Sequence, residues 1–451
     1  MSAAPEAQPI DWVDPEALFL AGPARSPHAF WLDAGPDAER GWSWMGTGEP
    51  EASFPRSLAL ARERSPIPGG FGGGWVGWAD YDAAAARAGA PASVQAAPSV
   101  LRVRRTVAFD HAERRAWVIA PGGERADAEA EVAAWSARAA AEPASAPPPP
   151  AVASTPLAAT ARDTPAGYVA LIDACRAAIR AGDAYQLCLT TKFEVDAAGA
   201  AIDPVSAYRR LRRALPSHHG GFVRIADRSL ASASPEEFLR VEDGIVRTRP
   251  IKGTRPRGAD PEEDAALAHD LAASPKERAE NVMIVDLMRN DLQRVCAPGS
   301  VTAERLLEVD THPAVHQLVS TVAGRLLPGT TLGGLLDATL PAGSMTGAPK
   351  LSAMGILHRL ERHPRGIYAG CFGWVGVDGS VDLAMTIRSV IMEPGGAYVG
   401  AGGGITWLSD AAAEVAEVAL KARGPLASLG ARLPEDWRGA ESVRRPSGNL
   451  E

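Results

Sequence analysis

One lysine stands in a stretch of the sequence whose composition would hold it in place. Lys252 lies in the run from 249 to 258, which has proline before it and both glycine and proline after it. Such spacing predicts a strand that ends in a stiff turn. Because side chains alternate along a strand, we expect Lys252 to share a face with Thr248 and Thr254. A lysine held in place in this way is a candidate nucleophile, and a long cation flanked by hydroxyls also suits an anionic ligand.

The same stretch allows a plainer interpretation. It carries a run of positive side chains: Arg247, Arg249, Lys252, Arg255 and Arg257. Such runs are often solvated edges or nucleic-acid patches. A non-catalytic anion- or nucleic-acid-binding protein is therefore one hypothesis, and it predicts binding that weakens steeply with salt and needs no metal. The net charge of -8 argues against nucleic acid as the main partner.

Carboxylates further along the chain point to a cation. Glu280 falls within a helix, 276 to 294, that is apolar nearly all round and is expected to be buried. Glu414 and Glu417 share one face of a later helix, although Glu417 with Lys421 also has the spacing of a surface salt pair. The glycine run at 402 to 404 precedes that helix, and its amides could cradle a carboxylate. Few oxygen ligands beside an anionic substrate are what Mg²⁺ prefers.

The composition of the 451 residues, 46% hydrophobic and 22% charged, is that of a globular enzyme with ample core. The N-terminus lacks the pattern of a signal peptide, and no run approaches the ~18 apolar residues of a membrane span. We therefore expect a cytoplasmic protein with no membrane partner. The four cysteines have no metal-ligand or redox spacing, which fits buried thiols.

Changes in composition divide the chain. Residues 143–163 are rich in proline and alanine and predict an exposed linker, and 426–451 form a polar tail. The N-terminal region, 1–142, reads as short strands followed by a helix. Beyond the linker, 164–425 alternates helices with strands, including one long strand expected over 381–392.

Several motifs together resemble the chorismate-utilising enzymes. They are Pro250 to Thr254, Ala279 to Leu292, Gly343 to Lys350, and Ala401 to Ile405 with Glu414 and Glu417. The resemblance covers most of Thr164 to Arg423. It implies an α+β fold in which two large antiparallel sheets pack face to face with helices outside. Residues 1–142 would contribute to this fold, and 164–425 would be the chorismate-binding catalytic domain.

Within that family, the lysine separates related reactions. Members that form 4-amino-4-deoxychorismate resemble this chain in having Pro-Ile-Lys-Gly-Thr, where members that form anthranilate have alanine in the lysine's place. Members that form isochorismate or salicylate activate water with a lysine at the position of Gln186, and an amide is not a general base. The resemblance thus implies amination of chorismate through a covalent adduct on Lys252, on the path to p-aminobenzoate and folate. Formation of anthranilate remains the nearest alternative.

The resemblance also implies roles for other residues. Glu236 would be the acid that protonates the departing hydroxyl. Mg²⁺ would be held by Glu280, Glu414 and Glu417. Substrate contacts would come from Thr254, Ser344, Thr346, Arg388, Gly402, Gly403 and Gly404. Because no activated cysteine with a histidine and a glutamate is evident for releasing ammonia, a separate glutamine amidotransferase subunit is the implied partner.

Overall fold

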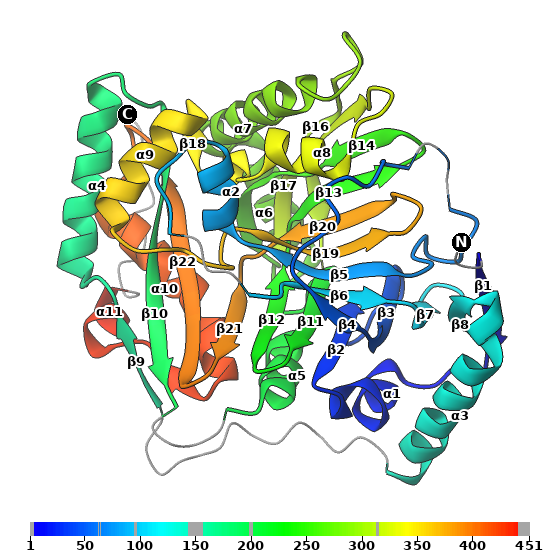
Figure 1. Ribbon diagram of the computed structural model, residues 1–451. Coiled ribbons are helices and arrows are strands. Elements are labelled where there is room, and N and C mark those ends of the chain that lie inside the picture. Colours follow the sequence, from blue (N-terminus) through cyan, green and yellow to red (C-terminus); the bar gives the residue numbers. More distant parts are fainter. Residues whose placement is uncertain are drawn as a thin grey trace.

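The computed structural model describes residues 4–61, 63, 65–93, 97–142, 157–197, 202–312 and 315–440. Two large sheets organise this part of the chain (Figure 1). The described strands of the first sheet run in the order β1 (Pro5–Ile10), β8 (Arg115–Pro121), β7 (Thr106–Asp110), β3 (Trp42–Thr47), β2 (His28–Asp33), β11 (His219–Ile225), β12 (Arg228–Ser234), β21 (Ser389–Glu393), β22 (Gly396–Ile405), β10 (Gln186–Asp196), β9 (Leu157–Ala161) and β23 (Ala431–Arg432), and β18 (Gly347–Ala348) pairs with β10.

The second sheet is smaller. Its described strands run in the order β15 (Ile251–Pro256), β17 (Val315–Arg325), β14 (Ile245–Thr248), β13 (Glu237–Glu242), β20 (Val381–Met385), β19 (Cys371–Gly376), β5 (Gly74–Ala79), β6 (Val100–Val103) and β4 (Glu49–Glu51), and β16 (Thr302–Thr311) pairs with β17. The paired strands of both sheets are antiparallel apart from β9 and β23, which are parallel. Strands from 1–142 and from the later chain lie in both sheets.

Helices lie outside the sheets. They are α1 (Pro15–Ala21), α2 (Tyr81–Arg87), α3 (Arg125–Ala141), α4 (Pro165–Arg180), α5 (Pro204–Ala214), α6 (Pro261–Ala273), α7 (Pro275–Gln293), α8 (Leu332–Thr339), α9 (Lys350–Glu361), α10 (Ala411–Ser428) and α11 (Glu435–Ala440), with short 3₁₀ turns η1 (Pro23–Arg25), η2 (Gly122–Glu124) and η3 (Gly343–Met345). In Figure 1, α4, α9 and α10 lie beside β10 and β22, and α7 lies beside β16 and β17. Among the described residues, no helix combines the length and the apolarity needed to cross a membrane.

Two apolar cores explain this arrangement. One joins the facing sides of the sheets, with Phe30 of β2 and Trp78 of β5 in the same cluster. The other joins the outer side of the larger sheet to its helices, with Phe193 of β10 and Val418 of α10 in one cluster. Alternating side chains let each strand contribute to both sides. The predicted α+β fold with two face-to-face antiparallel sheets is confirmed.

Three sequence expectations about the chain's organisation were wrong in part. The expected linker includes β9, which pairs with β10 because Leu157–Ala161 can extend that edge; 143–156 lie outside the described residues. The expected polar tail begins inside α10, which runs to Ser428, and continues into α11. There Trp437 is fully buried against Phe193 and Tyr168, so a single large ring fixes a polar segment. Residues 441–451 lie outside the described part.

The third difference concerns the long strand expected over 381–392. It is two strands, β20 and β21, and they belong to different sheets. Between them the chain crosses from one sheet to the other, and Arg388 adopts a left-handed backbone conformation with φ of 52°. No glycine or proline marks this crossing in the sequence, and the apolar pattern continues through it. The crossing brings Arg388 to the boundary between the two sheets.

Candidate active site

Lys252 lies on β15, where the strand is interrupted by a bulge. The pairing of β15 with β17 shifts register between Ile251 and Thr254, and Gly253 has φ of 84°. A bulge breaks the simple alternation of side chains. The predicted common face is therefore wrong: Thr248 is buried against Met288, whereas Thr254 is exposed. Lys252 is half-buried between these two environments.

Carboxylates from three separate segments lie within electrostatic reach of the Lys252 amine. Glu236 precedes β13, Glu280 lies on α7 and Glu417 lies on α10. Burial raises the pKa of Glu236 and of Glu280 and Lys421 lowers that of Glu417, while the positive charge of Lys252 acts on all three in the lowering direction. No hydrogen bond or ion pair joins Lys252 to another described residue. The predicted nucleophile thus faces the predicted acid and two predicted metal ligands, with its amine free to meet a substrate.

Glu236 is a buried carboxyl group. Burial raises its pKa to about 7, while a hydrogen bond from Ser344 and the charges of Lys252 and Lys421 act in the opposite direction. The Ser344 hydroxyl donates to Glu236 Oε1 at 3.0 Å. A carboxyl group with this pKa is protonated in part at neutral pH, as a general acid requires.

Gln186 occupies the far side of the same space. Its side chain is 1% exposed, and both polar atoms of its amide lack a hydrogen-bond partner in the described structure. A Cβ built on Gly404 would lie 2.4 Å from Gln186 Nε2 and 3.3 Å from Lys252 Nζ. The amide and the amine therefore meet over a position where only glycine fits. Buried polar groups without partners are rare in proteins, so this amide needs a polar partner, which a bound water or a ligand would supply.

The three predicted metal ligands differ in their surroundings. Burial raises the pKa of Glu280 and of Glu414, whereas Lys421 lowers the pKa of Glu417 to about 2. Glu280 has a weak contact with Lys276 at 3.8 Å. The described residues contain no ready-made group of three acidic, histidine or cysteine side chains at metal-binding distances. The chemistry of the three glutamates nevertheless suits Mg²⁺, because a nearby cation stabilises the charged form of a carboxylate whose pKa is raised by burial.

Helix α7 was expected to be buried all round, and this was wrong. Val282 is 45% exposed and Asp286 lies on the surface with it. The opposite face of α7, with Ile284 and Met288, packs into the core. Glu280 is thus half-buried at the margin between the core and the site.

The glycine run lies in a strand rather than in a loop. Gly402, Gly403 and Gly404 belong to β22 and pair with Thr190, Leu189 and Cys188 of β10. On its other edge β22 pairs with β21 only at 396–398. Because amides alternate between the two edges of a strand, the glycines beyond 398 keep backbone donors for an anion.

Arg388 is the predicted anion contact on the opposite wall. Burial lowers the pKa of its guanidinium, and the Glu417 carboxylate counteracts this effect. Its side chain has no hydrogen bond or ion pair with another described residue. An unpaired guanidinium with five donors is well suited to a carboxylate.

Two other predicted substrate contacts have partners of their own. Thr346 is fully buried, and its hydroxyl donates to the Ala342 carbonyl at 3.1 Å, which holds the η3 turn together. Ser344 of that turn bonds to Glu236. From its spacing, Lys421 was expected only as a member of a surface salt pair, and its place in the site was missed. Its Nζ donates to Glu417 at 2.8 Å and to the Gly402 carbonyl at 2.7 Å. Its position one turn after the paired glutamates was the available signal.

The arginines near Lys252 are paired with carboxylates. The pairs are Arg247 with Glu304, Arg249 with Asp310, Arg255 with Asp270 and Arg257 with Asp264. The expected run of uncompensated positive charge is therefore neutralised locally. This observation weakens the hypothesis of a nucleic-acid-binding strand.

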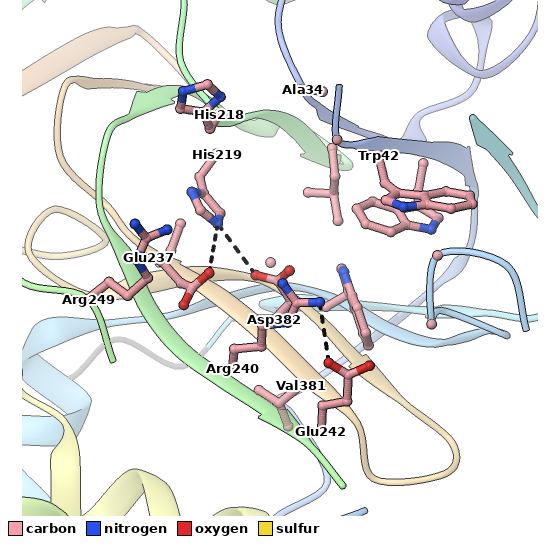
Figure 2. A pocket seen from close by; sticks show the side chains of 18 of the residues that line it. Ala34, Trp42, His218, His219, Glu237, Arg240, Glu242, Arg249, Val381 and Asp382 are labelled. Carbon is pink, nitrogen blue, oxygen red and sulfur yellow. Dashed lines mark hydrogen bonds and ion pairs between the residues drawn. The ribbon is translucent and has the colours of Figure 1, made fainter. Parts of the chain in front are cut away.

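A large cavity of about 750 Å³ lies beside this site (Figure 2). It is lined by both sheets, and Figure 2 shows the ring of His219 directed toward Glu237 and Asp382, at 3.7 and 3.8 Å. None of the residues predicted for the reaction lines it. Glu236 and Glu237 are neighbours in the chain but face different spaces. We place the candidate active site at Lys252, where a nucleophile, an acid and unpaired anion donors converge.

The sequence matches that of a known family. The family model described as chorismate binding enzyme matches residues 27–427. This chain belongs to that family. Among chorismate binding enzymes of known structure, anthranilate synthase component I from Streptococcus pneumoniae TIGR4 superposes with a TM-score of 0.69 and is 30% identical, over 94% of this chain and 92% of that one.

Curated chorismate binding enzymes include two kinds of relative. Aminodeoxychorismate synthase from Streptomyces griseus is 41% identical over 83% of this chain and 52% of its own length. Anthranilate synthase component 1 from Streptomyces coelicolor is 39% identical over 82% of this chain and 76% of its own length. The chain therefore spans about half the length of the two Streptomyces aminodeoxychorismate synthases that it matches.

Proposed function

We propose that this chain aminates chorismate at C4, forming 4-amino-4-deoxychorismate for the synthesis of p-aminobenzoate and folate. The observation that carries the proposal is the unpaired amine of Lys252, which belongs to the Pro-Ile-Lys-Gly-Thr stretch. The charge of this amine acts on the carboxylates of Glu236, Glu280 and Glu417. The 41% identity with an aminodeoxychorismate synthase supports it.

The proposed reaction has two displacements. Lys252, as the neutral amine, attacks C2 of the ring, and both conjugated ring double bonds shift as the C4 hydroxyl departs. Glu236 donates the proton that turns this hydroxyl into water. Ammonia then attacks C4, both double bonds shift back, and the C2 bond breaks so that Lys252 leaves as the neutral amine. The new ammonium group returns one proton to Glu236. The enolpyruvyl ether stays on the product throughout.

Substrate binding would use the anion donors on both walls. Chorismate has two carboxylates. Arg388 and those backbone amides of Gly402 to Gly404 that point away from β10 would hold anionic oxygen, and Ser344 would set the position of Glu236. Thr346 and Thr254 are the remaining proposed contacts. Thr346 would act by holding the η3 turn, and Thr254 lies at the exposed end of β15.

Mg²⁺ is the proposed cofactor, held by Glu280, Glu417 and Glu414. When bound, it would neutralise one of the substrate's carboxylates. The proposal is supported by the three carboxylates in the site, two of them raised in pKa by burial.

The Mg²⁺ site can be tested by substitution. Glu280→Gln is expected to weaken Mg²⁺ binding at least about tenfold, because it removes a charged oxygen ligand while keeping the side-chain volume. Calorimetric titration of the protein with Mg²⁺ measures this directly. Asp286→Asn is the matched control, since Asp286 lies on the same helix and faces solvent. Equal Mg²⁺ affinity in both variants would remove Glu280 from the site.

Ammonia would come from a partner. All four cysteines are buried, and burial raises the pKa of each thiol, which leaves the described chain without an activated thiolate for releasing ammonia from glutamine. A separate glutamine amidotransferase subunit is the proposed source.

The identity of the product tests the proposal. With chorismate, Mg²⁺ and an ammonium salt, the protein is expected to form 4-amino-4-deoxychorismate and to release no pyruvate. Separation of the products by liquid chromatography with mass detection measures both. Fluorescent anthranilate together with pyruvate would contradict the proposal and would identify an anthranilate synthase component 1, the alternative favoured by the 39% identity with that enzyme.

A further inference from the structure

A buried ion pair lies behind the wall of the candidate site that carries Ser344 and Gln186. Arg365 follows α9 and is 3% exposed, and its guanidinium donates two bonds to Glu361, at 2.9 and 2.7 Å. The same guanidinium lies over the ring of Tyr81 at 4.4 Å. Opposite charges at this depth require good hydrogen bonding, and each of the three guanidinium nitrogens of Arg365 donates at least one bond.

The remaining donors of Arg365 reach the backbone of two active-site segments. Nη1 donates to the Met345 carbonyl at 2.6 Å, and Nη2 donates to the Cys188 carbonyl at 2.8 Å. Met345 follows Ser344 in the η3 turn, and Cys188 lies two residues after Gln186 on β10. One rigid guanidinium thus ties together the turn and the strand.

Glu361 extends the same connection. Besides Arg365, it accepts bonds from the backbone amide and the hydroxyl of Thr190, at 2.9 and 3.0 Å. The Cys188 amide in turn donates to the Thr346 carbonyl at 2.7 Å. The turn, the strand and the end of α9 therefore form one hydrogen-bonded unit.

We propose that Arg365 is a positioning residue for the reaction: it fixes Ser344 against Glu236 and Gln186 against Lys252. The inference rests on the proposed function, because it needs Glu236 as the acid. Arg365 touches no reacting atom and acts through the Met345 and Cys188 carbonyls. A planar fork makes these bonds together, whereas a lysine in its place keeps the charge but cannot span both carbonyls and Glu361.

The product of the wild-type protein is identified first. The inference is then tested with the variant Arg365→Lys. The rate constant kcat for chorismate consumption is expected to fall on the order of 10- to 100-fold with little change in KM, because the groups are misplaced while the anion donors remain. The alkaline limb of kcat/KM, measured at constant free ammonia, is expected to move up by roughly half to one pH unit as the Ser344 bond to Glu236 weakens. The other charged groups that face Glu236, Lys252 on β15 and Lys421 on α10, are unchanged in this variant.

Two further variants separate positioning from simple stability. Ser344→Ala is expected to shift the alkaline limb in the same direction, and the double variant is expected to shift it no further. Arg212→Lys is the matched control: Arg212 is also buried, pairs with Glu16 and Asp33, lies 4.5 Å over Trp31, and makes no bond to the described residues of the η3 turn or of β10. It is expected to lower the melting temperature and leave the pH profile in place.

The possible outcomes are distinct. A pH profile for Arg365→Lys that matches the wild type, or a shift equal to that of Arg212→Lys, would overturn the inference. If Arg365→Lys does not fold, Tyr81→Leu replaces it, since this change removes the stacked ring and spares the bonds; a smaller shift in the same direction is expected, and its absence overturns the inference. The rate is measured as chorismate consumption, which does not depend on which product forms. A failure of the proposed function would therefore be seen in the product of the wild-type protein, and a failure of this inference in the comparison of the variants.

Discussion

Replacing Lys252 with alanine is expected to lower the rate of amination of chorismate by at least about 10³-fold, because no other described amine faces the site in its place. The Lys421 amine is bonded to Glu417 and to the Gly402 carbonyl, and it cannot take over the role. The measurement is the rate of 4-amino-4-deoxychorismate formation with saturating chorismate, Mg²⁺ and ammonium salt. Folding should be little affected, since Lys252 makes no hydrogen bond that the change would break.

Lys252→Arg is the control for charge. Arginine keeps a positive charge among Glu236, Glu280 and Glu417 but does not act as a nucleophile, because its guanidinium stays protonated. If the lysine only balanced these carboxylates, arginine would restore much of the rate; if it forms the adduct, arginine is expected to be as inactive as alanine.

The adduct itself can be observed. In the absence of ammonia, the wild-type protein is expected to gain the mass of chorismate less one water, and neither Lys252 variant should do so. Intact-protein mass spectrometry measures this. Full amination activity in Lys252→Ala would show that Lys252 is not the nucleophile, whatever the mass of the wild type.

The sequence predicted much of this site because its chemistry is carried by short motifs. Lys252 and the three metal-site glutamates each lie in a short motif that can be recognised without knowledge of the fold, whereas the role of Glu236 was implied only by the resemblance to a family. Their convergence could not be derived from spacing, because it depends on β15, α7 and α10 meeting across more than 160 residues of chain. The resemblance to a family supplied that step.

Other features depended on contacts that leave no local pattern. Arg365 acts on two backbone carbonyls, and nothing in its neighbourhood of the sequence shows which carbonyls lie near it. The crossing at Arg388 lies within a continuous apolar run, so periodicity predicted one strand. Trp437 is fully buried, although the segment around it is polar. In each case tertiary packing overrides the local signal.

The acid role of Glu236 gives the second large expected effect. Glu236→Gln is expected to lower kcat on the order of 10² to 10⁴-fold, since glutamine fills the same buried space and accepts the Ser344 bond but has no proton to give. The melting temperature should change little, because the amide replaces a carboxyl group whose burial already favours the neutral form.

The pH profile identifies Glu236 more sharply than the loss of rate. A general acid works in its protonated form, so kcat/KM of the wild type should fall as the pH rises through the pKa of Glu236, about 7. This limb should be absent from Glu236→Gln at constant free ammonia. Glu237→Gln is the matched control, because Glu237 is the next carboxylate in the chain and faces the large cavity beside His219 instead. A wild-type limb that persists in Glu236→Gln, or disappears in Glu237→Gln, would assign the acid to another group.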